Sequence, residues 1–315
     1  MYNGTEVEFI LLGFPGFQDK ESKLILSAFF FSVYVLILLE NLFIVIVIVI
    51  DENLHKPMYI FVCNLALVDM LIGIFMGSII IPKMLVSFMF NWNTISFAGC
   101  FMQALLYIYV FVVQMNILAV MCYDRVLAVC SPLQYTTIMT NQVVIRLLLF
   151  CWTSAWILQL LLICFALRLT FCGPNKILNC YCNHSSIIKM SCSDYAFNDM
   201  LGLTVGLSNT VAYSCVFLIS YSKILANVLQ IKTPGGHRKA FWTCGSHLCL
   251  VSTTILSSAF VYVSSRITWF SIDTKLLVSM MQNFLCPLLN PAVYAFMTKD
   301  IKEIIKKMVQ KKMNY

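Results

Sequence analysis

Residues 24–50 read LILSAFFFSVYVLILLENLFIVIVIVI, an apolar run that contains a single charged residue, Glu40. A helix that crosses the ~30 Å hydrocarbon core of a membrane needs ~20 residues of this kind. Lipid offers no hydrogen bonds, so the backbone of a spanning segment must satisfy itself as a helix. Membrane β-strands would be about half as long and would alternate in polarity. The run therefore predicts a membrane-spanning helix.

Six more apolar stretches follow, and each is long enough to span a membrane. The seven stretches are Leu24–Ile50, Pro57–Ile81, Phe97–Val129, Val143–Leu167, Met200–Val228, Ala240–Val263 and Leu276–Met297. The composition agrees, since 60% of the 315 residues are hydrophobic and only 11% are charged. A soluble domain of this length would carry far more charge. We expect an all-α integral membrane protein, with a bundle of seven transmembrane helices in residues 24–298.

The distribution of lysine and arginine predicts how the bundle is inserted. With the N-terminus outside, thirteen of the 21 cations lie inside, and six of these belong to residues 299–315. We therefore expect a multi-pass plasma-membrane protein, with residues 1–23 as an extracellular tail and the C-terminus in the cytoplasm. Two N-x-S/T sequons, at Asn3 and Asn183, fall on the outer side and predict N-linked glycans.

Residues 299–315 form a basic tail with apolar residues at helical spacing. This pattern predicts a short amphipathic helix that lies on the inner membrane surface. Its lysines should bind anionic lipid headgroups. Nucleic acid is the poorer partner, since the chain offers no basic, aromatic-rich soluble surface. The apolar positions are Ile301, Ile304, Ile305 and Met308.

Five cysteines fall on the side predicted to be extracellular. They are Cys100, at the start of the third stretch, and Cys172, Cys180, Cys182 and Cys192 in the loop 168–199. An oxidising exterior favours disulfides, and five cysteines can form two bridges with one thiol left over. A metal site that uses Cys180, Cys182 and His184 is the alternative, although disulfides already explain the cluster.

Charged or strongly polar side chains inside a span are costly and usually functional. Asp69 lies in the middle of the second stretch, where it needs partners such as Asn41 and Asn290, a cation or a proton. Asp124 and Arg125 lie at the inner end of the third stretch, where both are expected to reach water and to pair. A pair that merely snorkels to the interface is the alternative.

The residues around Asp124 resemble a family signature. Residues 121–135 read MCYDRVLAVCSPLQY, which is similar to the MAYDRYVAICxPLxY signature of vertebrate olfactory receptors, a family of rhodopsin-like G protein-coupled receptors. Three other segments resemble motifs of that family in the same order. They are LHKPMY at 54–59 for LHxPMY, KAFWTCGSHL at 239–248 for KAFSTCxSHL, and PLLNPAVY at 287–294 for PxLNPxIY.

The resemblance implies a receptor that binds a small odorant within its helix bundle. It also implies activation of a stimulatory, olfactory-type heterotrimeric G protein, which raises cyclic AMP. The implied disulfides are Cys100–Cys182 and Cys172–Cys192, with Cys180 unpaired. An arginine held by its neighbouring aspartate in one state would be released to the G protein in the other. The residues of this implied switch are Asp124, Arg125, Tyr221, Asn290 and Tyr294.

The chain departs from the family pattern at several positions, which include Glu40 for Gly, Val126 for Tyr and Trp242 for Ser. Gln114 stands where many members carry Glu, close to the buried aspartate. A neutral amide there removes one anion, which argues against strong sodium binding. The expected buried polar pocket consists of Asn41, Asp69, Gln114 and Asn290.

A small-molecule pocket in a helix bundle is expected in its outer half. Tyr107, Phe111 and Gln114 recur at i, i+4 and i+7, so they share one face of the third helix. Simple helix packing is the alternative for any apolar residue here, whereas polar side chains that face the interior need partners. The predicted ligand-binding residues are Tyr107, Ile108, Phe111, Val112, Val205, Asn209, Ser258, Tyr262 and Arg266.

Arg266 follows Tyr262 by four residues, so a sixth helix extended by about one turn places both at the mouth of the pocket. A cation there can pair with a ligand carboxylate, which predicts carboxylic acids among the ligands. The alternative is an exposed arginine that contacts loop acids or headgroups.

Enzymatic motifs are missing from the sequence. It contains no H-E-x-x-H, no G-x-S-x-G and no phosphate-cradling glycine loop, and its four histidines lie far apart. We expect neither catalysis nor a cofactor or metal. A transporter or channel is the rival class, but it would predict internal repeats and broken mid-membrane helices, and neither is visible.

Overall fold

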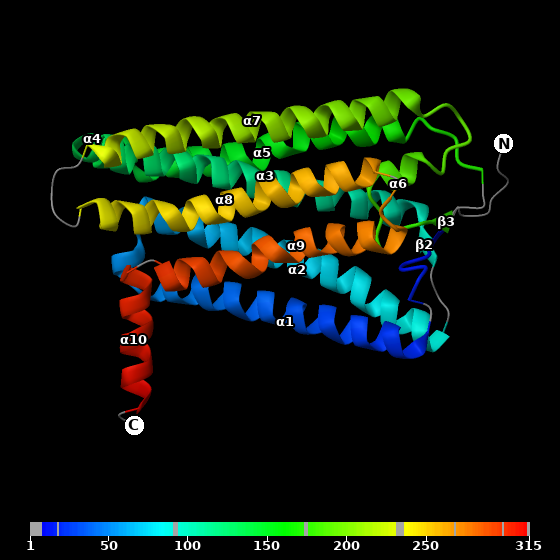
Figure 1. Ribbon diagram of the computed structural model, residues 1–315, viewed down its shortest axis with the longest axis horizontal. Coiled ribbons are helices and arrows are strands. Elements are labelled where there is room, and N and C mark those ends of the chain that lie inside the picture. The colour runs from blue at the N-terminus through cyan, green and yellow to red at the C-terminus, as the bar shows by residue number, and fades with distance from the viewer. Residues whose placement is uncertain are drawn as a thin grey trace.

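The computed structural model describes residues 8–17, 19–90, 94–172, 176–230, 236–267, 269–297 and 299–313, with only the backbone described at some of these positions. Within these ranges seven long helices run side by side along one axis (Figure 1). They are α1 (Lys20–Ile50), α2 (Pro57–Phe90), α3 (Phe97–Cys130), α5 (Asn141–Ala166), α7 (Ala196–Leu229), α8 (Gly236–Arg266) and α9 (Ile272–Met297). The predicted seven-helix bundle is confirmed.

The long helices extend beyond most of the apolar stretches that predicted them. Helix α1 begins at Lys20 because the Asp19 carboxylate caps it and accepts a hydrogen bond from the Ser22 N–H at 2.7 Å. Helix α5 begins at Asn141 because the Thr140 hydroxyl accepts from the Val143 N–H. Apolarity marks only the part of a helix that lies in lipid, so polar first turns escape a search for apolar runs.

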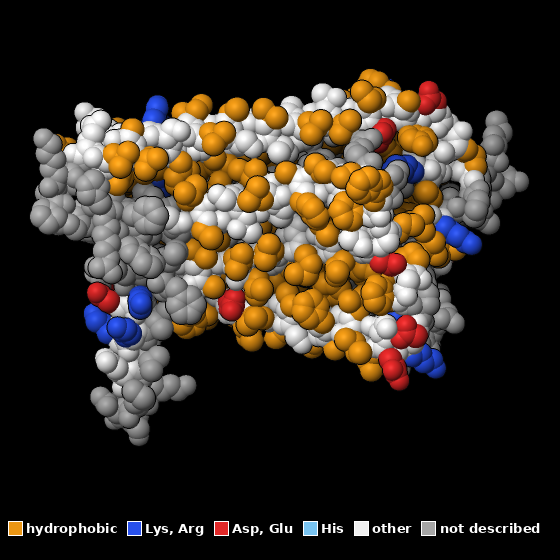
Figure 2. Space-filling model, in the orientation of Figure 1, with side chains coloured by type: hydrophobic (Ala, Val, Ile, Leu, Met, Phe, Trp, Pro, Cys, Tyr) orange, Lys and Arg blue, Asp and Glu red, His pale blue; other side chains and the backbone are white. Residues whose placement is uncertain are grey.

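The surface of the bundle is suited to lipid. Among the described residues, six helices are long and apolar enough to cross a membrane, and α8 contains a shorter apolar segment, His247–Val261. Large apolar side chains stay exposed, among them Ile157 at 73% and Leu218 at 69%. Figure 2 shows hydrophobic side chains along the bundle, with most charged side chains near its two ends. So much exposed apolar surface indicates a membrane protein that crosses the bilayer several times.

Helix α3 lies at the centre of the bundle and contacts α2, α5, α7 and α8. Helix α1 packs against α2 and α9 at the periphery. Gly73 of α2 permits close approach, since a methyl group there would meet the Ile37 side chain at 3.3 Å. The buried core therefore runs from α1 through α2 and α3 toward α5 and α7.

A small sheet, which the all-α prediction did not include, covers one end of the bundle, here called the cap end. It consists of β1 (Glu8–Leu11), β2 (Thr94–Ser96) and β3 (Lys176–Ile177), in the order β2-β1-β3. Strand β1 pairs antiparallel with β2 and parallel with β3. Phe9 is fully buried and contacts the rings of Phe97 and Phe171. The strands are too short for alternation to reveal them.

The loop after α5 also belongs to the cap end. It contains the short helix α6 (His184–Ile188) and the Cys172–Cys192 disulfide, and a second disulfide, Cys100–Cys182, joins it to the first turn of α3. Cys182 is therefore not available as a metal ligand. Cys180 is a buried free thiol, and burial raises the pKa of this thiol to about 12. A protonated thiol is a poor nucleophile, so Cys180 is unsuited to exchange with the neighbouring bridge.

The opposite end, here called the tail end, carries the 3-10 helix η1 (Glu52–Leu54) and two helices, α4 (Pro132–Ile138) and α10 (Lys299–Met313). Figure 1 shows α10 turned crosswise to the bundle. Ile301 and Ile304 of α10 are buried against the bundle, while Lys302 and Lys306 are exposed. The predicted amphipathic C-terminal helix is confirmed.

Helix α10 is fixed to the start of α2. The Tyr59 hydroxyl donates to Asp300 Oδ2 at 2.9 Å, and Lys56 Nζ lies 3.5 Å from the same oxygen. Both partners belong to the segment 54–59, so the turn into α2 also positions the C-terminal helix.

We predict that Cys100→Ser and Cys182→Ser each abolish surface expression. Loss of a native bridge typically costs about 2–5 kcal/mol, and this bridge joins residues 82 apart in sequence. Cys180→Ala is the control, because it removes a thiol without breaking a bridge. Flow cytometry with an N-terminal epitope measures the surface population, and equal loss in all three variants would contradict this account.

Candidate functional site

A buried carboxylate joins three helices at the centre of the bundle. Asp69 on α2 is fully buried, and its two oxygens accept hydrogen bonds from amides on α3 and α9. Gln114 Nε2 donates to Oδ1 at 2.6 Å, and Asn290 Nδ2 donates to Oδ2 at 2.7 Å. In this low-dielectric interior each of these bonds is stronger than it would be in water.

Asn41 lies beside this carboxylate but bonds to a different group. Its amide donates to the Pro287 carbonyl at 3.0 Å and to the Ile37 carbonyl at 2.9 Å. The Pro287 carbonyl needs this donor because the residue four positions on, Pro291, has no N–H. The proline spacing on α9 thus creates the acceptor that Asn41 uses to join α1 to α9.

The same region contains unsatisfied acceptors. In the described part of the chain, Asn41 Oδ1 and Asn290 Oδ1 are buried without a hydrogen-bond partner. Asn41, Asp69, Asn290 and Tyr294 line one small cavity. The cavity is too narrow to hold a water molecule, so these oxygens could gain a partner there only if the side chains moved apart. Gln114 contributes an amide nitrogen rather than a charge, which limits the negative potential of the cavity.

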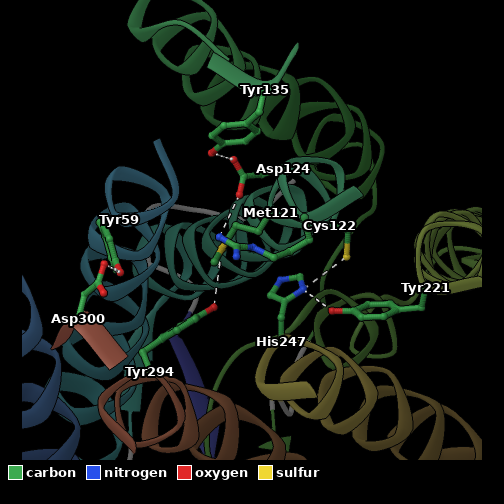
Figure 3. Close-up of polar contacts among 10 residues, drawn as sticks. Tyr59, Met121, Cys122, Asp124, Tyr135, Tyr221, His247, Tyr294 and Asp300 are labelled. Atoms are coloured by element: carbon green, nitrogen blue, oxygen red, sulfur yellow. Dashed lines mark hydrogen bonds and ion pairs between the residues drawn. The ribbon is translucent and has the colours of Figure 1, made fainter. Parts of the chain in front are cut away.

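A second polar group lies at the tail end (Figure 3). Arg125 Nη2 is 3.1 Å from Asp124 Oδ2, and the Tyr135 hydroxyl donates to Asp124 Oδ1 at 2.7 Å. The prediction that Asp124 and Arg125 both reach water is wrong, since their side chains are only 1% and 9% exposed. Tyr135, from α4, covers the pair. Burial and the nearby Asp124 charge raise the pKa of the Tyr135 phenol, which therefore remains a donor.

Tyr221 and Tyr294 lie near this ion pair in Figure 3. The buried Tyr294 hydroxyl donates to Met121 Sδ at 3.8 Å, and the Tyr221 oxygen is 2.7 Å from His247 Nδ1. His247 is also 3.7 Å from Cys122 Sγ. Asn290, which the sequence assigned both to the switch and to the buried polar pocket, bonds to Asp69 in that pocket.

His247 was not among the residues predicted from sequence. It is buried in α8 and its Nε2 has no partner within the described residues. The signal was present, because a histidine within an apolar span needs polar partners as much as an aspartate does. In the sequence, His247 is part of the KAFWTCGSHL segment that resembles a family motif.

Toward the cap end, two predicted pocket residues bond to adjacent positions of α9. The Tyr107 hydroxyl of α3 donates to Asn283 Oδ1 at 2.6 Å. Gln282 Nε2 donates to the Ser258 hydroxyl of α8 at 2.8 Å. Helices α3 and α8 are therefore connected through neighbouring side chains of α9.

The loop after α5 forms a roof over this region. The Tyr181 ring lies 5.2 Å from the Tyr107 ring, centroid to centroid, and its hydroxyl is 2.7 Å from Ser279 Oγ. Ser279, Gln282 and Asn283 recur at i, i+3 and i+4 on α9, within an otherwise apolar segment. The spacing rule that singled out Tyr107 on α3 would have found them.

The other predicted pocket residues are less closely linked. Ile108, Phe111 and Val112 pack within the bundle core, and Val205 and Asn209 are half-buried on α7. The side chains of Tyr262 and Arg266 lie outside the described residues. Of the predicted glycosylation sites, Asn3 also lies outside them. Asn183 caps α6 by accepting from the Ser186 N–H at 2.8 Å.

The chain is similar in sequence to olfactory receptors over almost its full length. The sequence model of a family described as "Olfactory receptor" matches residues 30–312. The chain is 37% identical to olfactory receptor 2A12 of Homo sapiens over 304 residues, 96% of each chain. It is 34% identical to olfactory receptor 6B9 of Mus musculus over 310 residues, and 35% identical to olfactory receptor 5I1 of Homo sapiens over 308, each covering 98% of this chain and 96% of the relative.

We predict that Asp69→Ala lowers the melting temperature of the detergent-solubilised protein. The change leaves the Gln114 and Asn290 amides without their acceptor, and each unsatisfied buried donor costs about 1–3 kcal/mol. Asp69→Asn keeps one acceptor oxygen and should cost less. The control Glu303→Ala removes an exposed carboxylate and should change little. An Asp69→Ala protein as stable as the control would show that the carboxylate does not hold the three helices together.

Proposed function

Because the chain belongs to the olfactory receptor family, we propose that it binds an extracellular odorant in the cap half of its bundle and activates a stimulatory heterotrimeric G protein. The consequence in the cell is a rise in cyclic AMP. In this proposal the N-terminus and the cap end face outward and α10 faces the cytoplasm. The chain is a receptor and not an enzyme.

The observation that carries the proposal is the buried pair of Asp124 and Arg125. A buried guanidinium needs an acidic or polar partner, and here it has a carboxylate that Tyr135 holds from the other side. Movement of the helices at this end would uncover Arg125, which could then contact a helix of the G protein. Arg125 would thus pair with Asp124 in one state and contact the G protein in the other, and a ligand would shift the equilibrium between these two states.

Helix α8 connects the proposed ligand site to the switch. Ser258 bonds to Gln282 near the ligand site, and His247 bonds to Tyr221 near the Asp124–Arg125 pair. The two α8 residues are eleven positions apart in one helix, about 16 Å along its axis. A ligand that shifts α8 at Ser258 would therefore disturb the Tyr221–His247 contact.

The chemistry of the two ends supports the proposed orientation. Both disulfides belong to the cap end, and disulfides persist in an oxidising exterior. The exposed lysines of α10 belong to the tail end, where we propose that they bind anionic headgroups of the inner leaflet. Glycans at Asn3 and Asn183 would then lie outside the cell.

We predict that Arg125→Ala leaves the receptor at the cell surface and silences its cyclic AMP response, because the residue that contacts the G protein is lost. A panel of volatile ligands on transfected cells provides the readout, with surface staining measured in parallel. Arg146→Ala is the control, since Arg146 is an exposed arginine on α5. Full signalling by Arg125→Ala would exclude this arginine from the switch.

We further propose that Arg266, at the end of α8, pairs with a ligand carboxylate. A charge-assisted hydrogen bond contributes about 1.5–3 kcal/mol, so Arg266→Ala should weaken carboxylic acids by about tenfold or more. Neutral agonists should lose little. Dose–response curves for matched acids and methyl esters test this, with Arg168→Ala as the control at the same end. Equal shifts for acids and esters would make Arg266 a structural residue.

A further inference from the structure

The Asn283 amide is held in one orientation deep in the bundle. Its side chain is 5% exposed, and Oδ1 accepts the Tyr107 hydroxyl at 2.6 Å. The other end of the amide, Nδ2, is buried and has no hydrogen-bond partner among the described residues. Because Tyr107 engages the oxygen, the nitrogen is left to face a different group.

Neighbouring polar groups on α9 are already engaged. Ser279 pairs with Tyr181 of the roof, and Gln282 donates to Ser258. The unsatisfied amide atoms elsewhere in the described chain are oxygens, at Asn41, Gln159, Asn198 and Asn290. Asn283 Nδ2 is thus the single unsatisfied amide nitrogen in the described ranges, and it occurs where α3, α8, α9 and the roof meet.

An unsatisfied buried donor costs about 1–3 kcal/mol, and folded proteins retain few of them. An unsatisfied donor is tolerated where a bound ligand accepts its hydrogen bond. A site with such a donor discriminates strongly against ligands that have no acceptor to offer it. Tyr107, which orients the amide, is itself one of the predicted ligand-binding residues.

We propose that Asn283 Nδ2 donates a hydrogen bond to an oxygen acceptor of the odorant, such as the oxygen of a ketone, an aldehyde or an ester. The inference rests on the proposed function and specifies the ligand class of the same site. An amide nitrogen can only donate, so a ligand must accept. Hydrocarbons of the same shape would leave the donor unsatisfied and bind more weakly.

The test measures ligand binding by thermal shift of the purified full-length receptor in lipid nanodiscs. The probes are medium-chain methyl ketones and methyl esters, with alkanes of equal length as the comparison. Ketones and esters should raise the melting temperature of the unaltered receptor, because a ligand that binds the folded state stabilises it. Asn283→Leu, which keeps the branched shape of the side chain but removes the donor, should weaken these ligands by about tenfold or more.

Two variants separate the donor from a packing role. Asn64→Leu makes the same exchange on α2, where the amide donates to the Ile60 carbonyl of its own helix, and should leave the ketone response unchanged. Tyr107→Phe keeps the ring against Tyr181 but frees the amide to rotate. The amide oxygen could then face the ligand and accept a hydrogen bond from an alcohol hydroxyl. The affinity for alcohols should therefore rise relative to that for ketones, which a change in packing alone would not produce. Asn283→Ala replaces Asn283→Leu if the larger side chain prevents folding.

The possible results separate the role of Asn283 from the proposed receptor function. An unchanged ketone affinity in Asn283→Leu, or an equal loss for ketones and alkanes, overturns the donor role. Ketones and esters that fail to stabilise the unaltered receptor overturn the acceptor class, while a cyclic AMP response to other odorants leaves the proposed function intact. A surface-expressed receptor that responds to no odorant overturns both.

Discussion

Hydrocarbon offers no hydrogen bonds, so polar side chains within this bundle are stabilised by partners on other helices or on their own backbone. Asp69 shows the result, since it holds α3 through Gln114 and α9 through Asn290. Asn41 attaches α1 to a carbonyl of α9 that Pro291 leaves free. The apolar surface keeps the chain in the membrane, and these few polar contacts determine how its helices are arranged.

Sequence reasoning recovered the helices because the length of an apolar run is a local property that lipid selects directly. It did not recover the sheet at the cap end, because β1 pairs with residues that lie far along the chain. The helix termini were also misplaced, since polar caps such as Asp19 lie outside the apolar run. Local patterns predict elements, whereas contacts between distant segments need the folded chain.

The candidate site likewise consists of residues that the sequence indicates and of contacts that it does not. The sequence indicated Asp69 together with its partners Gln114 and Asn290, and it indicated the pairing of Asp124 with Arg125. It did not indicate that Tyr135 bonds to Asp124 or that Asn283 bonds to Tyr107. Arg125 was expected to reach water and is buried, because Tyr135 from the short helix α4 covers the pair. A side chain's neighbours depend on tertiary packing, which no single segment of sequence contains.

The middle position of β1 in the cap sheet has a consequence for the order of assembly. This strand is synthesised before every transmembrane helix, yet β2 follows α2 and β3 follows α5. Strand β1 can therefore pair with β2 only after α1 and α2 have been synthesised, and with β3 only after α3 and α5 have followed. Only then can the sheet close over the bundle, so completion of the cap marks the moment at which the first half of the receptor has assembled.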